Sequence, residues 1–133
     1  MVLTAAYVSL AGIERSGDLN KAELSAEVEE KDVTTFKSLG WKEVVGGLKS
    51  GSLALSFKND LAAAAVDQAM WDALGTVVPF VVRASQAAVG TSNPQYSGNV
   101  LVKSWTPIAG APGDVNESNH TYPTSGPVVR ATA

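Results

Sequence analysis

The stretch of sequence that decides the fold is Lys21-Ala22-Glu23-Leu24-Ser25-Ala26-Glu27-Val28-Glu29-Glu30-Lys31. Small and aliphatic residues alternate in it with Lys, Glu and Ser, and a period of two indicates a β-strand with one apolar face. The segment 52–58 repeats this pattern, because Leu53, Leu55 and Phe57 occupy every second position. We therefore expect two amphipathic strands that pair with each other.

Further strands are predicted at residues 5–10, 76–83 and 98–105, which are rich in Val, Thr and aromatic residues and are bounded by Gly, Pro or Asn. Pro79 lacks a backbone N–H, so the second of these strands is expected at a sheet edge or a bulge. The polar stretch 114–122 is a weaker strand candidate between Gly113 and Pro123.

One helix is predicted, at about residues 61–74. Asn59 or Asp60 would cap its first turn, and Gly75 suits the left-handed residue that follows a last turn. Its apolar stripe consists of Ala62, Val66, Met70 and Leu74. At this spacing the stripe would lie against a sheet, with Trp71 at the rim of the core.

The loop at 32–51, between the two amphipathic strands, is unusually long for a compact domain. It is also too apolar for a flexible linker, and its apolar residues are Phe36, Leu39, Trp41, Val44, Val45 and Leu48. Four of them match one face of a helical turn before Gly46 and Gly47 interrupt it. The loop is expected either to fold back as a lid over one end of the sheet or to dock on a neighbouring chain, and we favour docking.

Composition excludes several classes of function. The 133 residues include no cysteine and one histidine, carry a net charge of −3, and are 45% hydrophobic and 17% charged. The absence of cysteine and the single histidine argue against disulfides and against a thiolate or multi-histidine metal site. The negative net charge argues against nucleic-acid binding, and the low charged fraction argues against a disordered chain. We expect one soluble globular domain without a signal peptide, membrane insertion, metal or cofactor.

Catalytic interpretations have little support. A serine triad could be written with His120 and Asp114, but there is no nucleophile elbow, and His120 is expected to be solvated. Glu27 and Glu29 could form a glycosidase pair, although a wetted sheet surface explains them better. No phosphate-binding glycine motif is present. We therefore do not expect an enzyme.

Several local phrases of the chain resemble the major tail protein, or tail tube protein, of long-tailed bacteriophages that infect actinobacteria. They are the run 19–36 that contains the deciding stretch, the motif Gly40-Trp41-Lys42-Glu43, residues 48–53, and the ending 122–133. The resemblance covers most of the chain. It implies a mainly β, β-sandwich or barrel-like tail tube fold with one flanking α-helix and a long inter-strand loop. The single domain 1–133 would end in an extended segment, 123–133.

The resemblance also implies a function. Such proteins form rings, expected to be hexameric, that stack into the hollow tail tube through which DNA passes into the host. The partners would be further copies of the chain, a tape-measure protein and tail tip or terminator proteins, with viral DNA passing without specific binding. The protein would belong to the virion tail and assemble in the host cytoplasm.

Mapped onto this sequence, the resemblance places strands 21–31 and 52–58 in the sheet around the lumen and docks the long loop on an adjacent ring. The residues expected to face the lumen are Lys21, Glu23, Ser25, Glu27, Glu29, Ser52, Ser56 and Lys58. An acidic or neutral lumen would repel phosphate and favour passage of DNA over binding. The alternative is a β-sandwich carbohydrate- or surface-binding module of a virion, which needs an exposed aromatic platform from Trp41, Trp71 or Trp105. The last two are expected to be at least partly buried.

Overall fold

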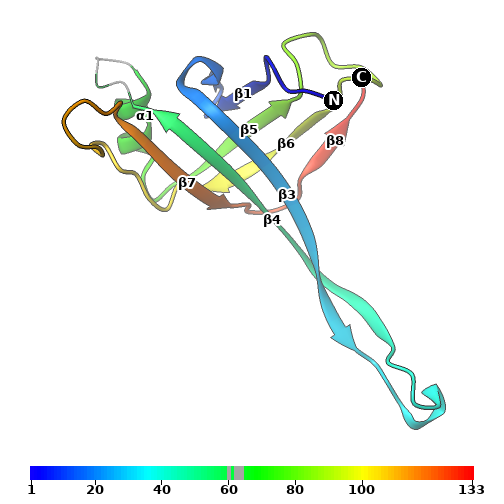
Figure 1. Ribbon diagram of the computed structural model, residues 1–133. Helices are drawn as coiled ribbons and strands as arrows, with labels where there is room; N and C mark the ends of the chain where they lie inside the picture. Colours follow the sequence, from blue (N-terminus) through cyan, green and yellow to red (C-terminus); the bar gives the residue numbers. More distant parts are fainter. Residues whose placement is uncertain (60, 62–64) are drawn as a thin grey trace.

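The computed structural model describes residues 1–59, 61 and 65–133 of the chain. The strands are β1 (Tyr7–Leu10), β2 (Ile13–Glu14), β3 (Leu19–Asp32), β4 (Val44–Lys58), β5 (Val77–Arg83), β6 (Gln95–Leu101), β7 (Glu117–Pro123) and β8 (Val129–Ala131). The described residues also form the α-helix α1 (Val66–Ala73) and two short 3-10 turns, Ser16–Asp18 and Phe36–Ser38. Two antiparallel sheets result, with strand orders β2-β1-β5-β6-β8 and β3-β4-β7 (Figure 1).

The two sheets face each other as a β-sandwich, which confirms the predicted fold class. Both sheets contribute to one core, and α1 closes it at one end. The buried apolar residues are Val8, Leu10, Leu53, Leu55, Phe57, Val66, Met70, Phe80, Val100, Val102, Trp105 and Tyr122. The alternation predicted for 52–58 is therefore confirmed, because every second residue of this segment lies in the core.

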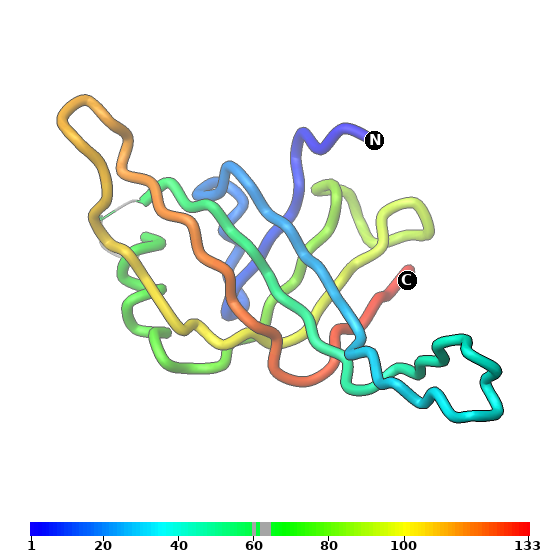
Figure 2. Tube along the Cα trace, turned by 60° about the horizontal axis from the view of Figure 1, so that its bottom comes forward, coloured from blue at the N-terminus to red at the C-terminus, as the bar shows by residue number. Residues whose placement is uncertain are grey.

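The predicted pairing of the two amphipathic strands is also confirmed. β3 and β4 are antiparallel, with Lys21 opposite Ser56 and Asp32 opposite Val44. β7 pairs with the second half of β4, from Ser52 to Lys58. Beyond Ser52, β3 and β4 continue as a two-stranded arm that projects from the sandwich and ends in a tip, residues 33–43 (Figures 1 and 2).

This arm corrects the prediction for the loop. Residues Val44 to Leu48 belong to strand β4, so the helical turn expected there is wrong. Gly46 and Gly47 do not break the strand but allow close approach across the pair: a Cβ at Gly46 would lie 2.9 Å from Val28 Cγ1. The lid alternative is also wrong, since the arm points away from the sheets (Figure 1).

Pro79 does not mark an edge strand. It lies in β5, the central strand of the five-stranded sheet. Its carbonyl accepts a hydrogen bond from Ala11 N (2.8 Å), just past the end of β1 at Leu10. Because the N and C=O of one strand residue point to the same side, the missing N–H faces a position where β1 has already turned away. The proline therefore costs little in pairing.

The helix is shorter than predicted. α1 begins at Val66 after an extended Ala65, and Leu61 lies outside it, while Asp60 and residues 62–64 lie outside the described residues. Asn59 does not cap α1, because its side chain bonds the loop between β6 and β7. Gly75 has the expected positive φ (84°). Of the predicted stripe, Val66 and Met70 are buried and Leu74 is partly exposed.

Two further strands differ in extent from the prediction. β6 begins at Gln95, where it pairs with β8, and the chain leaves the strand after Leu101 so that Trp105 packs edge-on against Phe57. The weak candidate at 114–122 is strand β7. Residues 123–133, where an extended segment is predicted, contain β8, an edge strand of three residues.

Candidate functional site

The tip of the arm has a defined structure. Glu43 N donates to Thr34 Oγ1 (2.8 Å) and Val33 N donates to Glu43 O (2.9 Å), which ties the two sides of the tip together at its base. Hydrogen bonds from the Thr34 side chain and backbone lower the pKa of Asp32. Thr35 and Ser38 bond each other's backbone in a capping box, and Leu39 (φ 55°) turns the chain back. The tip is therefore held by its own hydrogen bonds without support from the sandwich.

The apolar residues predicted for docking lie along this arm and expose their side chains. Phe36 is fully exposed, and Leu39 and Trp41 are 85% and 78% exposed. Phe36 and Trp41 both line a hollow of about 600 Å³ at the tip. Val44, Val45 and Leu48 follow in β4 and are also exposed. The structure thus gathers the predicted docking residues on one projecting element, where the isolated chain leaves them in water.

A second surface is the outer face of the three-stranded sheet. Seven of the eight residues expected to face the lumen are exposed or partly exposed on strands β3 and β4 at alternating positions, and the eighth, Glu29, lies at a β-bulge of β3. Ser25 Oγ and Ser52 Oγ are hydrogen bonded across the strands (3.0 Å). β7 extends the face with Asn119 opposite Ser56 and Thr121 opposite Ala54. The face is a continuous polar surface rich in hydroxyl and amide groups.

Sequence reasoning missed the contribution of Asn119 and Thr121. A period of two was present in 117–123, but two of the three inward residues are polar, Ser118 and His120, so the pattern did not stand out as amphipathic. The third inward residue, Tyr122, is completely buried.

The charges on the polar face balance within the three-stranded part. Lys21 and Lys58 offset Glu23 and Glu117, and Lys21 Nζ lies 3.9 Å from Glu23 Oε2. Glu27 and Glu29 lie on the arm, beyond the end of β7 at Pro123. The face is therefore close to neutral where three strands form it.

His120 belongs to the core, so the expectation of a solvated histidine is wrong. Its ring is stacked between Trp105 (centroids 5.3 Å apart) and Tyr122 (5.7 Å), and Nδ1 lies 3.0 Å from Ser104 Oγ. Nε2 is buried and has no hydrogen-bond partner among the described residues. A catalytic triad needs a carboxylate at the histidine, but Asp114 instead accepts a hydrogen bond from Ala111 N (2.9 Å).

The burial of His120 predicts a pH-dependent stability. Burial lowers the pKa of His120 in the folded chain, whereas the unfolded chain keeps a value near about 6.5. Below that pH the unfolded state binds a proton that the folded state does not bind. The free energy of unfolding should therefore be highest above pH 7 and fall towards pH 5, by at most about 1.4 kcal/mol per pH unit.

Urea unfolding at pH 5, 6, 7 and 8 measures this slope. His120→Phe keeps an aromatic ring at the site and removes the titration, so its slope between pH 7 and 5 should be smaller than that of the unsubstituted protein. Equal slopes in the two proteins would show that other groups cause the dependence.

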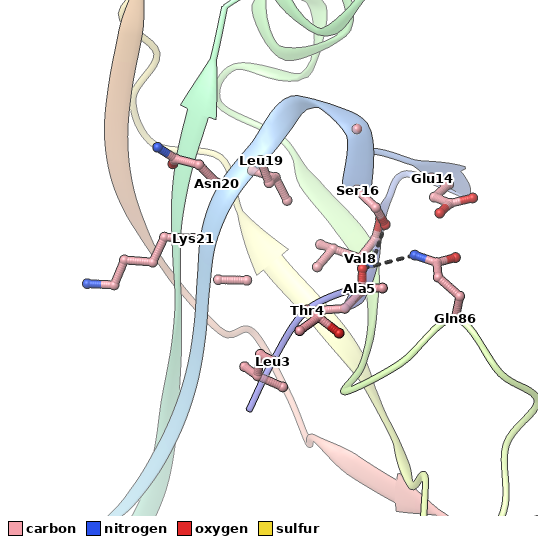
Figure 3. Close-up of a pocket in the computed structure, with 13 residues that line it drawn as sticks. Leu3, Thr4, Ala5, Val8, Glu14, Ser16, Leu19, Asn20, Lys21 and Gln86 are labelled. Carbon is pink, nitrogen blue, oxygen red and sulfur yellow. Dashed lines mark hydrogen bonds between the residues drawn. The ribbon is translucent and has the colours of Figure 1, made fainter. Parts of the chain in front are cut away.

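The sandwich is open along the free edge of β3. One hollow of about 600 Å³ lies between the N-terminal segment and the start of β3, where Leu3, Val8 and Leu19 line it (Figure 3). Ser16 Oγ and Gln86 Nε2 anchor the N-terminal segment beside it through Val8 N (2.9 Å) and Ala6 O (3.0 Å). A second hollow, of about 510 Å³, follows β3 and is mainly apolar; it is lined by Ala22, Leu24, Ala26, Val82, Tyr96 and Val128, among others.

The three tryptophans do not form a shared binding platform. Trp105 is buried, with Nε1 donating to Asp67 (2.9 Å). Trp71 on α1 is 59% exposed, so it is partly buried as expected, and it lies at the opposite end of the molecule from Trp41. A carbohydrate-binding module therefore finds no support in their arrangement.

Within the described part of the chain, no group of three or more acidic, histidine or cysteine side chains is placed to hold a metal ion. In the same residues, no helix has the length and apolar character needed to cross a bilayer.

No protein-family model and no curated protein matches the chain. Solved structures do. A chain from the virion of a native gene transfer agent (GTA) particle superposes with a TM-score of 0.66 at 21% identity, over 86% of this chain and 85% of that chain. The fold is shared with a gene transfer agent tail. A second match, to a chain from the tail of an empty GTA particle with C6 symmetry, has a TM-score of 0.66 and 22% identity over 87% of this chain and 83% of that chain.

The likeness extends over most of both chains, so the whole sandwich and not a local motif is shared with these particles. At this level of identity it shows the fold.

Proposed function

We propose that this chain is a structural virion protein, the subunit of a phage-like tail tube that assembles from stacked hexameric rings and conducts DNA into the host. The observation that carries the proposal is a projecting arm with exposed aromatic residues on a sandwich whose fold matches a GTA tail chain. The sixfold ring is supported by the C6 symmetry of that tail. The finer assignment, a major tail protein of an actinobacterial phage, is supported by the sequence phrases that resemble this family.

Ring formation would use the free edge of β3. This strand has 14 residues and, among the described residues, pairs on one side only, with β4. A long unpaired edge is an aggregation hazard in a monomer, but a closed ring of identical subunits covers every such edge. The apolar hollows beside β3 would be covered in the same contact.

The polar face of the three-stranded sheet would line the tube. Its hydroxyl and amide groups and its balanced charges offer no net attraction to phosphate, so DNA would pass without being held. A tape-measure protein would occupy the same channel, and tip and terminator proteins would close the two ends. The protein would be found in the virion tail after assembly in the host cytoplasm.

Electron microscopy of the purified protein at increasing concentration tests this function. We expect rings with six subunits and tubes built from them. A protein that remains monomeric at millimolar concentration and with crowding agents would contradict the proposal.

Adding positive charge to the polar face should create DNA binding. Ser56→Lys with Asn119→Lys places two cations beside Lys21, and each new phosphate contact should steepen the salt dependence of binding by about one unit in log–log slope. Gel shifts with duplex DNA at 50 and 200 mM salt measure this. Ser56→Thr with Asn119→Gln is the matched neutral control. Binding by the control would show that the native face already attracts DNA.

A further inference from the structure

The arm tip and the loop between β6 and β7 lie at opposite ends of the same strand. β4 begins at Val44, next to the tip, and ends at Lys58, which pairs with Glu117 at the end of that loop. The 15 residues of β4 span roughly 45 Å in extended conformation. Figures 1 and 2 both show the tip and the loop at the two ends of the molecule. They cannot touch within one chain.

The loop end exposes apolar residues of its own. Ile108 and Val115 are 76% and 63% exposed, and α1, with the exposed Trp71, lies at the same end (Figure 2). Val115 borders a hollow of about 370 Å³ that is also lined by the carboxylates Asp114 and Glu117. This end is therefore apolar with an acidic rim.

The loop is held in shape before any contact forms. Asn59 Nδ2 donates to Thr106 O (2.8 Å), while Asn116 Oδ1 accepts from Ala109 N (2.9 Å) and its Nδ2 donates to Pro107 O (3.0 Å). A surface ordered in advance loses less conformational entropy on binding than a flexible one. Two asparagine side chains thus preorganise the loop.

The tip complements this surface in charge. Lys37 and Lys42 flank its aromatic residues; Lys42 Nζ is 2.9 Å from Glu30 Oε1, and Lys37 has no ion-pair partner among the described residues. If two copies align end to end, the lysines of the tip therefore meet the carboxylates beside Val115. Complementary charges around an apolar centre are the usual arrangement of a specific interface.

We infer that the loop between β6 and β7, with its Ile108, Asp114 and Val115, forms the receptor for the arm tip of a second copy together with Glu117 at the start of β7. The inference rests on the proposed stacking of rings and names the surface that receives the arm. The contact joins two different surfaces head to tail, so it can repeat from one copy to the next along the axis of β4.

Disulfide trapping tests this contact cleanly, because the native chain contains no cysteine. Leu39→Cys and Ile108→Cys are made in separate proteins, mixed, allowed to assemble and oxidised with copper phenanthroline. We expect a covalent dimer on non-reducing gels that forms only in the mixture. The doubly substituted protein should give a ladder of higher multimers.

The matched control replaces Leu39→Cys by Val2→Cys, since Val2 has the same 85% exposure and lies away from the tip. The mixture with Ile108→Cys should then give little dimer. Tubes that form without the Leu39–Ile108 cross-link would overturn the inference and leave the proposed function standing. Absence of both rings and cross-links, with folded protein, would overturn the two together.

Discussion

Trp41→Ala is expected to eliminate tubes while leaving the subunit folded. The side chain is 78% exposed at the arm tip, so its removal opens no cavity in the sandwich. Aromatic residues at the centre of an interface commonly contribute about 2 kcal/mol or more, which corresponds to a roughly 30-fold weaker contact. Because each ring would repeat the contact at every subunit, the loss should shift the protein from tubes to rings or monomers.

Sedimentation and electron microscopy measure assembly in this variant, and thermal unfolding measures its stability. The free energy of unfolding should change by no more than about 0.5 kcal/mol, as for other exposed positions. Trp41→Phe, which keeps an aromatic ring, should retain part of the tube formation. Normal tubes from Trp41→Ala would show that the tip does not carry the stacking contact.

Phe57→Ala should have the opposite outcome, a loss of folding. Phe57 is completely buried in β4 and packs edge-on against Trp105, with ring centroids 5.1 Å apart. Truncating a buried phenylalanine costs about 3–5 kcal/mol, a large part of the total stability of a domain of this size. Urea unfolding should show a much lower midpoint or no folded baseline.

Phe57→Leu is the control for this substitution, since it keeps most of the apolar volume and should cost clearly less. A loss below about 1 kcal/mol in Phe57→Ala would mean that the core relaxes around the cavity. The two aromatic substitutions together separate folding, which depends on the sandwich interior, from assembly, which we propose to depend on the arm.

The strands with a clear period of two could be predicted from sequence, and so could their pairing. This worked for β3 and β4 because one face of each is apolar where the sandwich covers it. It worked less well for β7, whose inward Ser118 and His120 are polar and find their place beside Asn59 and within an aromatic stack. When polar side chains face the core, the sequence pattern does not show which face of the strand is buried.

Proline and glycine residues inside strands were the second source of wrong predictions. Pro79 indicates an edge strand in isolation, and only the end of β1 explains why the central position is allowed. Gly46 and Gly47 suggest a break, yet they lie in a strand where Val28 and Lys31 pass close by. In both cases the residue that explains the backbone position belongs to another strand, so the local sequence pattern could not show it.

The sequence indicates which residues form the candidate site but not how they are arranged in space. The apolar residues from Phe36 to Leu48 are predicted to dock on a neighbouring chain because they are too apolar for a free loop. β7 pairs with β4 only from Ser52 to Lys58, and no local signal in the sequence specifies this length. Because β7 ends there, these residues belong to a projecting arm, and Glu27 and Glu29 lie on the same arm.

In the proposed stack of rings, the arm of β3 and β4 would also set a distance. Side chains change face with every residue of a strand, so an arm that lengthened by one residue per strand would turn its exposed aromatic residues to the other side. Only even insertions preserve the orientation of the tip, and each pair of residues adds roughly 7 Å. If the arm sets the distance between rings, that distance can change among related tubes only in steps of this size, and the length of a hairpin then determines the pitch of the tube.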